Sequence, residues 1–199
     1  MDVDTVALSA RWAAAWGDCR PLSYELRSCL EDRWVRFHSL PGSKRYAGDE
    51  REHAEVLRRH QVVLGGLLWH EPGDGGEEIL VVSASWSASP EPANRDPGLT
   101  SVMPAAYWTS VLTDASIPGD EIWTHLWASA SRLPGDDLTR LLRLAADDET
   151  AGVIITSAAM SWLYAPCDGG ADVIAATSQH RDELRHRHQH WLSAHPAGL

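Results

Sequence analysis

The sequence predicts a single α+β domain over residues 1–199, with a predominantly antiparallel sheet of about five to six strands covered by helices on one side. Strand-type and helix-type segments follow one another without the regular alternation of a parallel sheet, and some strands are joined by short turns. A chain of 199 residues, 44% hydrophobic and 23% charged, is long enough for one buried core. No linker divides it, and no internal repeat is visible.

The first half of the chain is expected to alternate helices with two strands. Apolar residues recur at helical spacing from Asp4 to Trp16, and Gly17 provides a stop. The further segments are a short helical run over 22–30, a strand over 33–40, a polar loop over 43–48, a helix from an Asp49 N-cap to about Trp69, an exposed turn over 71–76 and a central strand over 79–86. In the long helix, Arg51, Arg58 and Arg59 are expected at solvated positions.

The second half is expected to add strands, a hairpin and the last helix. Its segments are a surface loop over 87–98, a brief helix over 105–112, a strand over 122–133, a helix over 136–147, a strand over 153–156, hairpin strands over 161–165 and 171–176, and a helix from about Ser178. Between the hairpin strands, Gly169 and Gly170 are expected to provide positive φ angles.

Charge and cysteine content exclude several classes of protein. The formal net charge of -11 repels phosphate backbones and anionic lipid, so we expect neither nucleic acid nor membrane as a partner. The amino terminus lacks the features of a signal peptide, and no apolar run approaches about 20 residues, which places the protein in the cytoplasm. Three widely spaced cysteines favour reduced thiols. The ten tryptophans are expected to line the core or a pocket.

The loop from Cys167 to Asp172 places a thiol and two carboxylates close together. If a histidine lay within hydrogen-bond reach, the thiolate could attack a carbonyl while Asp168 oriented that histidine. In the structural alternative, which turn statistics favour, Asp168 caps the turn and Asp172 pairs with a nearby arginine. The sequence contains no phosphate-binding, dinucleotide-binding, zinc-protease or serine-hydrolase signature.

A basic loop precedes the long helix. Lys44 and Arg45, next to Tyr46, are suited to hold an anion at the helix start, or else to pair with the acidic first turn or with the hairpin acids. The candidate ligand-binding residues are Arg36, His38, Lys44, Arg45, Tyr46, Asp168 and Asp172. No catalytic residue, cofactor or metal is assigned.

The histidines near the carboxyl end resemble a metal-binding tract only at first sight. On a continuous helix His186 and His190 share a face, whereas His188 turns toward Leu184 and Trp191 and is expected to be partly buried. Because two ligands do not make a metal site, we interpret the tract as a solvated histidine face.

Two segments carry a resemblance to a known family. Residues 33–46, which read RWVRFHSLPGSKRY, and residues 162–174, which read WLYAPCDGGADVI, resemble an uncharacterised family of small bacterial proteins labelled a domain of unknown function, as does the terminal stretch 191–199. The resemblance implies an aromatic residue at the position of Cys167. This chain departs from it there, which weakens the thiol-nucleophile hypothesis.

Two classes of function remain open at this stage. The first is a non-enzymatic, cytoplasmic protein-binding protein, immunity-like or regulatory, whose acidic surface binds a basic or hydrophobic partner. The alternative is a small enzyme or ligand-binding domain for an anionic metabolite, with Lys44 and Arg45 holding the anion and Asp168 or Asp172 as acid or base. Oligomeric state, substrate and partner identity are not predicted.

Overall fold

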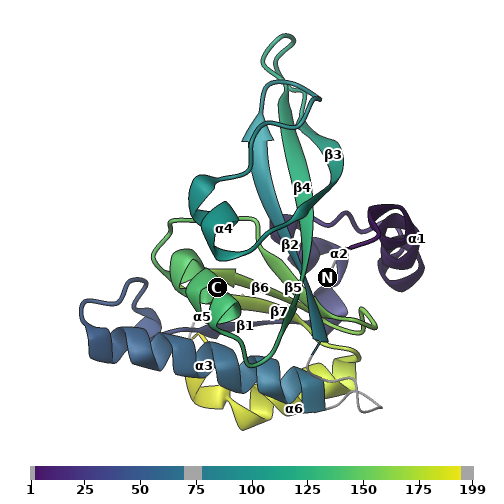
Figure 1. The fold of residues 1–199 in the computed structure, drawn as a ribbon. Helices are drawn as coiled ribbons and strands as arrows, with labels where there is room; N and C mark the ends of the chain where they lie inside the picture. Colours follow the sequence, from purple (N-terminus) through teal and green to yellow (C-terminus); the bar gives the residue numbers. More distant parts are fainter. Residues whose placement is uncertain (1–2, 70–77, 194–199) are drawn as a thin grey trace.

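The structure is a computed structural model that describes residues 3–69 and 78–193. Its centre is one antiparallel sheet of seven strands in the order β1-β7-β6-β5-β2-β4-β3 (Figure 1). The strands are β1 (Trp34–His38), β2 (Glu78–Ser87), β3 (Ala106–Asp114), β4 (Ile122–Arg132), β5 (Ile154–Ser157), β6 (Leu163–Cys167) and β7 (Gly170–Ile174). The α+β class and the antiparallel sheet are confirmed, but the sheet has seven strands where five to six were predicted.

Six α-helices and four short 3-10 helices surround the sheet in the described residues. The α-helices are α1 (Thr5–Trp16), α2 (Leu26–Cys29), α3 (Glu50–Trp69), α4 (Pro97–Val102), α5 (Asp136–Ala146) and α6 (Ser178–Arg187). The 3-10 helices are η1 (Ser23–Glu25), η2 (Glu31–Arg33), η3 (Pro41–Ser43) and η4 (Gln189–Trp191). The exposed turn predicted over 71–76 lies outside the described residues.

The strand that the sequence analysis missed is β3. We predicted a helix over 105–112, but these residues pair with β4 in a long antiparallel hairpin. The segment contains Tyr107, Trp108 and Val111, which fit a pleated surface, and pairing with β4 from Ile122 to Ala128 outweighs the weak helical pattern.

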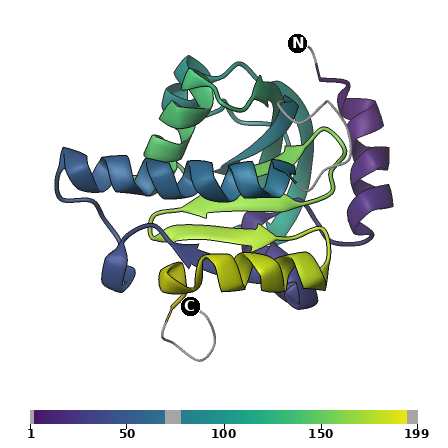
Figure 2. The ribbon, with the colours of Figure 1, turned by 90° about the horizontal axis from the view of Figure 1, so that it is seen from below.

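Helices cover both faces of the sheet, so the prediction of one covered side was wrong. Along β2, Ile79 and Val81 enter one apolar core, whereas Leu80 and Val82 enter the other. Helices α3, α4, α5 and α6 contribute to the first core, and α1 and α2 to the second. Figure 2 shows α3 and α6 running roughly parallel to each other along the strands, with α1 apart from both at the right.

The β6–β7 hairpin is placed as predicted, but for a different reason. Neither Gly169 nor Gly170 has a positive φ angle. Gly170 lies opposite His38 in β1, where a Cβ atom would come within 2.0 Å of the Phe37 carbonyl oxygen. The glycine is therefore required because two backbones approach closely.

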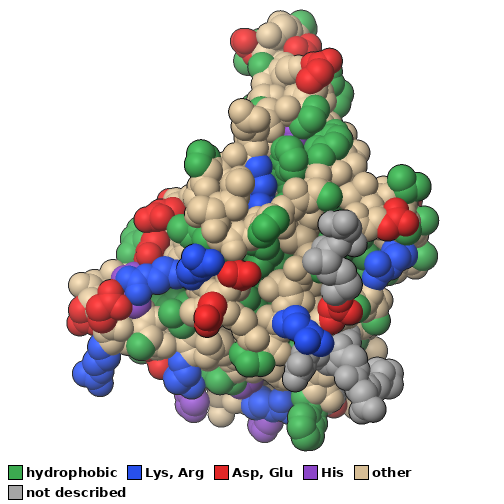
Figure 3. Space-filling model, viewed as in Figure 1, with side chains coloured by type: hydrophobic (Ala, Val, Ile, Leu, Met, Phe, Trp, Pro, Cys, Tyr) green, Lys and Arg blue, Asp and Glu red, His purple; other side chains and the backbone are tan. Residues whose placement is uncertain are grey.

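Part of the sheet projects beyond the rest. Strand β2 pairs with β5 only from Ile79 to Val82, whereas it pairs with β4 along its full length. We call residues 83–127 the distal arm and the strands β1, β5, β6 and β7 the proximal strands. The arm extends away from the helices at its base, and acidic side chains gather at its tip (Figures 1 and 3).

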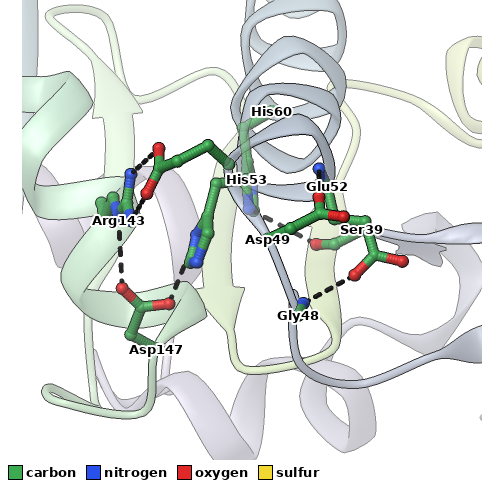
Figure 4. Close-up of polar contacts among 9 residues, drawn as sticks. Ser39, Gly48, Asp49, Glu52, His53, His60, Arg143 and Asp147 are labelled. Carbon is green, nitrogen blue, oxygen red and sulfur yellow. Dashed lines mark hydrogen bonds and ion pairs between the residues drawn. The ribbon is translucent and has the colours of Figure 1, made fainter.

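Helix α3 begins as predicted, with the Asp49 carboxylate accepting a hydrogen bond of 2.9 Å from the Glu52 backbone N–H. Figure 4 shows this end of α3 linked to α5, where Arg143 and Asp147 bond residues of the first turns of α3.

One side-chain prediction for α3 was wrong, because Arg59 is buried. Its guanidinium donates to Glu55 at 2.7 Å and to the His38 carbonyl at 3.0 Å, which satisfies it away from water.

The carboxyl-terminal histidines are not arranged as a single helix face. Helix α6 ends at Arg187, so His190 lies in η4 and not one turn below His186 on the same helix. His188 is buried as expected and stacks on Trp191 with ring centroids 4.4 Å apart. Within residues 3–69 and 78–193, no group of three or more potential metal ligands is present.

Candidate functional site

The register of β1 on β7 places Arg36 opposite Asp172. The Arg36 guanidinium donates two hydrogen bonds, from Nε to Oδ1 at 2.8 Å and from Nη2 to Oδ2 at 2.6 Å. The Trp34 indole N–H donates a third bond to the same carboxylate, at 2.8 Å. The hydrogen bond to Asp172 raises the pKa of Arg36, so the guanidinium stays charged. The predicted pairing of Asp172 with a nearby arginine is confirmed.

The basic loop is divided between two carboxylates. Arg45 Nε lies 2.7 Å from the Asp168 carboxylate, to which the Tyr46 hydroxyl also donates at 3.0 Å. Lys44 instead pairs with Glu52 in the first turn of α3. The structure therefore shows both of the ion pairings that were weighed against an anion site, and each cation of the loop already has a carboxylate.

His38 is the last residue of β1 and lies on the same face of the strand as Trp34 and Arg36. Burial lowers its pKa, and the neighbouring Arg36 lowers it further, so the ring is neutral at pH 7. Its Nε2 atom is buried and has no hydrogen-bond partner among the described residues. His38 is next to the ion pairs but makes no bond to either hairpin acid.

The Cys167 thiol does not have the surroundings of a nucleophile. Burial raises its pKa, which favours the protonated form that does not attack carbonyls. No hydrogen bond joins it to a histidine in the described part of the chain. The geometry therefore does not support the thiol-nucleophile hypothesis.

A groove lies beside these residues, between η1 and the sheet. It consists of two adjoining hollows, of about 210 and 200 Å³, which share Ser23, Tyr24, Ala151 and Gly152. The first hollow contains charged side chains beside apolar ones and is lined by Arg36, Asp148, Cys167, Asp168 and Asp172 among others. The second is apolar, with Leu22, Ala84, Trp86 and Leu126 in its walls. We call the two hollows together the aromatic groove, because Tyr24 and Trp86 are exposed along it.

The groove contains residues that the sequence analysis did not select. Tyr24 and Trp86 are 61% and 47% exposed, which is unusual for aromatic side chains in a folded chain. Asp148 lines the first hollow, whereas Glu149 only follows it in the chain; both are exposed, and their carboxylates bond no described residue. The acidic run 147–149 was the sequence signal for this loop, but nothing in the sequence placed it beside η1.

Behind the groove, on the other face of the sheet, a buried histidine is held by polar partners. His60 Nδ1 lies 2.5 Å from the Tyr164 hydroxyl and Nε2 lies 3.5 Å from the Ser39 hydroxyl, the contact drawn in Figure 4. Complete burial lowers the pKa of His60 to about 4, so it is neutral at pH 7. This histidine has no route to a ligand in the groove and serves the core.

The fold and the groove define an α+β protein with a seven-stranded antiparallel sheet, helices on both faces and an acidic, aromatic surface groove. The chain belongs to the family described as Domain of unknown function (DUF3885), whose model matches residues 22–196. The predicted resemblance to a domain of unknown function is thus confirmed. No curated protein and no solved structure matches the chain. In the described residues, no helix combines the length and the apolar character needed to cross a membrane.

Proposed function

We propose that this chain is a non-enzymatic, cytoplasmic protein-binding protein, immunity-like or regulatory, and that its aromatic groove binds a basic segment of a partner protein. The observation that carries the proposal is the division of the groove acids into two sets. Asp168 and Asp172 are held by Arg45 and Arg36, whereas Asp148 keeps an exposed carboxylate; the exposed Glu149 follows Asp148 in the chain but does not line the groove.

The paired acids are poor candidates for catalysis. A general base needs a free lone pair within reach of a substrate proton, and Asp172 already accepts three hydrogen bonds. An anionic metabolite meets the same difficulty, since Arg36, Lys44 and Arg45 are each neutralised by a carboxylate of the chain. The alternative of an anion-processing enzyme would require these pairs to break.

The remaining groove has the chemistry that suits a cationic segment. Exposed aromatic rings provide apolar area and attract guanidinium groups over their faces, and Tyr and Trp often dominate the energy of protein interfaces. The free carboxylate of Asp148 at one end, the exposed Glu149 next to it and the net charge of -11 attract a basic partner during its approach. An arginine of the partner can stack on Tyr24 or Trp86 while a second cation pairs with Asp148.

Affinity capture with matched variants tests the proposal. The tagged chain is incubated at physiological salt with lysate of the organism that encodes it, and the captured proteins are quantified by mass spectrometry. We expect Tyr24→Ala with Trp86→Ala to reduce capture of the same partner at least tenfold, since each aromatic contact at such a surface contributes about 1 to 2 kcal/mol. Asp148→Asn with Glu149→Gln should weaken capture mainly at low salt.

The control alters acids at the tip of the distal arm, far from the groove. Asp120→Asn with Glu121→Gln removes the same charge and should leave capture unchanged. The partner is then purified and its binding to each variant is measured by calorimetry. Capture of no partner, or of partners that the groove variants retain in full, contradicts the proposal.

A further inference from the structure

One arginine in the distal arm is buried without a counter-ion. Arg95 is 8% exposed, and its guanidinium lies against the polar face of β2. Its Nε donates to the Ser83 hydroxyl at 3.1 Å, and Nη1 donates to the backbone carbonyls of Leu99 and Met103. Nη2 is buried and donates to nothing in the described residues.

The charge of Arg95 is not neutralised within the described chain. No carboxylate forms an ion pair with it, and the adjacent Asp96 carboxylate instead accepts the Leu99 N–H at the start of α4. Arginine remains charged in proteins, and a buried charge without a partner is costly. Burial lowers the pKa of Arg95, and the charge of the nearby Asp96 carboxylate opposes this without forming an ion pair. Arg36 and Arg45, the arginines at the polar end of the aromatic groove, differ because each is paired with a carboxylate.

A hollow of about 580 Å³ opens beside this guanidinium. Its walls are formed by α4, the residues just before it and one side chain of β4, and the lining residues are Asn94, Arg95, Pro97, Thr100, Ser101, Ala105 and Trp127. The volume is in the range of small-molecule sites, about 300 to 1,000 Å³. The Asn94 amide is exposed and bonds no other described side chain or backbone group, so its N–H groups are available at the rim.

We propose that Arg95 and this hollow form a binding site for a small organic carboxylate with a flat apolar body. The carboxylate accepts hydrogen bonds from Arg95 Nη2 and the Asn94 amide, which satisfies the orphaned donor. The apolar body lies against the Trp127 indole, whose N–H is already bonded to Ser85 at 3.1 Å and which therefore offers only its ring.

The donor count selects a monoanion. Only one nitrogen of the Arg95 guanidinium is unused, since the other two are bonded to Ser83, Leu99 and Met103. The hydroxyls of Thr100 and Ser101 donate to backbone carbonyls within α4 and its start. A phosphate dianion would bring two charges and more oxygens than these donors satisfy, whereas one carboxylate balances one guanidinium.

Thermal unfolding of the whole chain tests the site with benzoate as the probe. We expect about 10 mM benzoate to raise the Tm by about 3 °C at constant ionic strength, the rise for a ligand near ten times its Kd. Benzamide, which has the same ring without the charge, and inorganic phosphate should leave the Tm unchanged. Benzoate should also shift the indole N–H resonance of Trp127 in a ¹H–¹⁵N spectrum.

Matched variants separate the site from general effects of charge. Arg95→Met should abolish the response, whereas Arg140→Met, which removes an exposed arginine of α5, should preserve it. Because Arg95 also anchors the segment around α4, Arg95→Met can fail to fold. Asn94→Ala leaves that anchor intact and should weaken benzoate binding about tenfold. The proposal is overturned by an unchanged wild-type Tm, by equal responses to benzamide or phosphate, or by full affinity in Asn94→Ala.

Discussion

The proximal strands and the distal arm belong to one sheet, but their partly buried arginines have different hydrogen-bond partners. At the β1–β7 pair, Arg36 meets a carboxylate that also accepts the Trp34 N–H, so charges and donors are matched within a few ångströms. In the arm, Arg95 meets only hydroxyl and carbonyl oxygens. Arg95 lies against the face of the arm that carries Ser83, Ser85 and His125. On the same face of the sheet, the proximal strands carry apolar side chains.

The difference separates architecture from binding capacity. A region whose polar groups satisfy one another gains nothing from a ligand, whereas a region with an unmatched charge is stabilised by any molecule that completes it. The hairpin acids, which are the most concentrated chemistry of the sequence, therefore act chiefly on stability. The unmatched groups of the arm and the free acids of the aromatic groove are the places where partners are expected.

The largest expected effect concerns the close approach of β1 and β7. Gly170→Ala would place a Cβ atom 2.0 Å from the Phe37 carbonyl oxygen, so the two strands would have to separate. We expect a loss of about 4 kcal/mol in the free energy of unfolding, measured by urea denaturation. Gly169→Ala is the control, because its nearest neighbour is the flexible Arg45 side chain at 3.7 Å, and it should change stability by less than about 0.5 kcal/mol. If Gly170→Ala lost as little stability as Gly169→Ala, the close approach of β1 and β7 would not require a glycine.

The second effect is the response of the proximal core to acid. His60 has a pKa of about 4 in the folded chain, below that of a free histidine, so the unfolded chain binds the additional proton first as the pH falls. Stability from the neutral ring is present above about pH 6.5 and declines down to about pH 4, with a loss of roughly 2.5 kcal/mol by pH 4.5. Urea denaturation at several pH values measures the loss. His60→Gln, which keeps a polar group beside Tyr164, should show a smaller decline, and an equal decline would place the acid sensitivity elsewhere.

The sequence predicted the proximal region better than the arm for a physical reason. Local signals determine the strand with Trp34 and Arg36 on one face, the Asp49 cap of α3 and the hairpin around Gly169. The strand and the cap follow from alternation and capping, which act within a few residues, and the glycine pair located the hairpin although Gly170 is required by the approach of β1 and not by the turn itself. The arm depends on β3, whose aromatic residues fit a helix or a strand until β4 pairs with them. Arg95 is buried by packing between β2 and α4, and Tyr24 and Trp86 line one hollow because η1 lies against the sheet, so no local pattern reveals either arrangement.

The third effect distinguishes the two hairpin acids. Asp172→Asn leaves the Arg36 charge half-buried without a counter-ion and should reduce stability by about 2 kcal/mol. Asp168→Asn disturbs a pair whose arginine is 67% exposed, so the cost should stay below about 1 kcal/mol. Both costs are read from urea denaturation at pH 7. If Asp172→Asn melted like the parent chain while partner capture was lost, the assignment of this pair to architecture would be wrong.

The smallest effect tests the polar face of the arm. His125 is buried between two serines, with Nε2 2.7 Å from the Ser87 hydroxyl and Nδ1 2.7 Å from the Ser110 hydroxyl. The Ser87 hydroxyl donates its single proton to the Ser89 carbonyl at 3.0 Å, so it accepts from His125. His125 therefore carries its proton on Nε2, and Ser110 donates to Nδ1.

Nitrogen chemical shifts of the His125 ring identify this tautomer directly. Ser87→Ala removes the acceptor, leaves a buried N–H without a partner and should cost about 1 kcal/mol. Tyr107→Phe removes only the outer hydroxyl, which bonds Ser110 at 2.8 Å near the surface, and should cost less than about 0.5 kcal/mol while the tautomer persists. A ring protonated on Nδ1 in the parent chain would reverse the donor order of the network. The hydroxyl of Ser110 would then accept from the ring, and the direction of the hydrogen bonds on the polar face of the arm would be the opposite of the one described above.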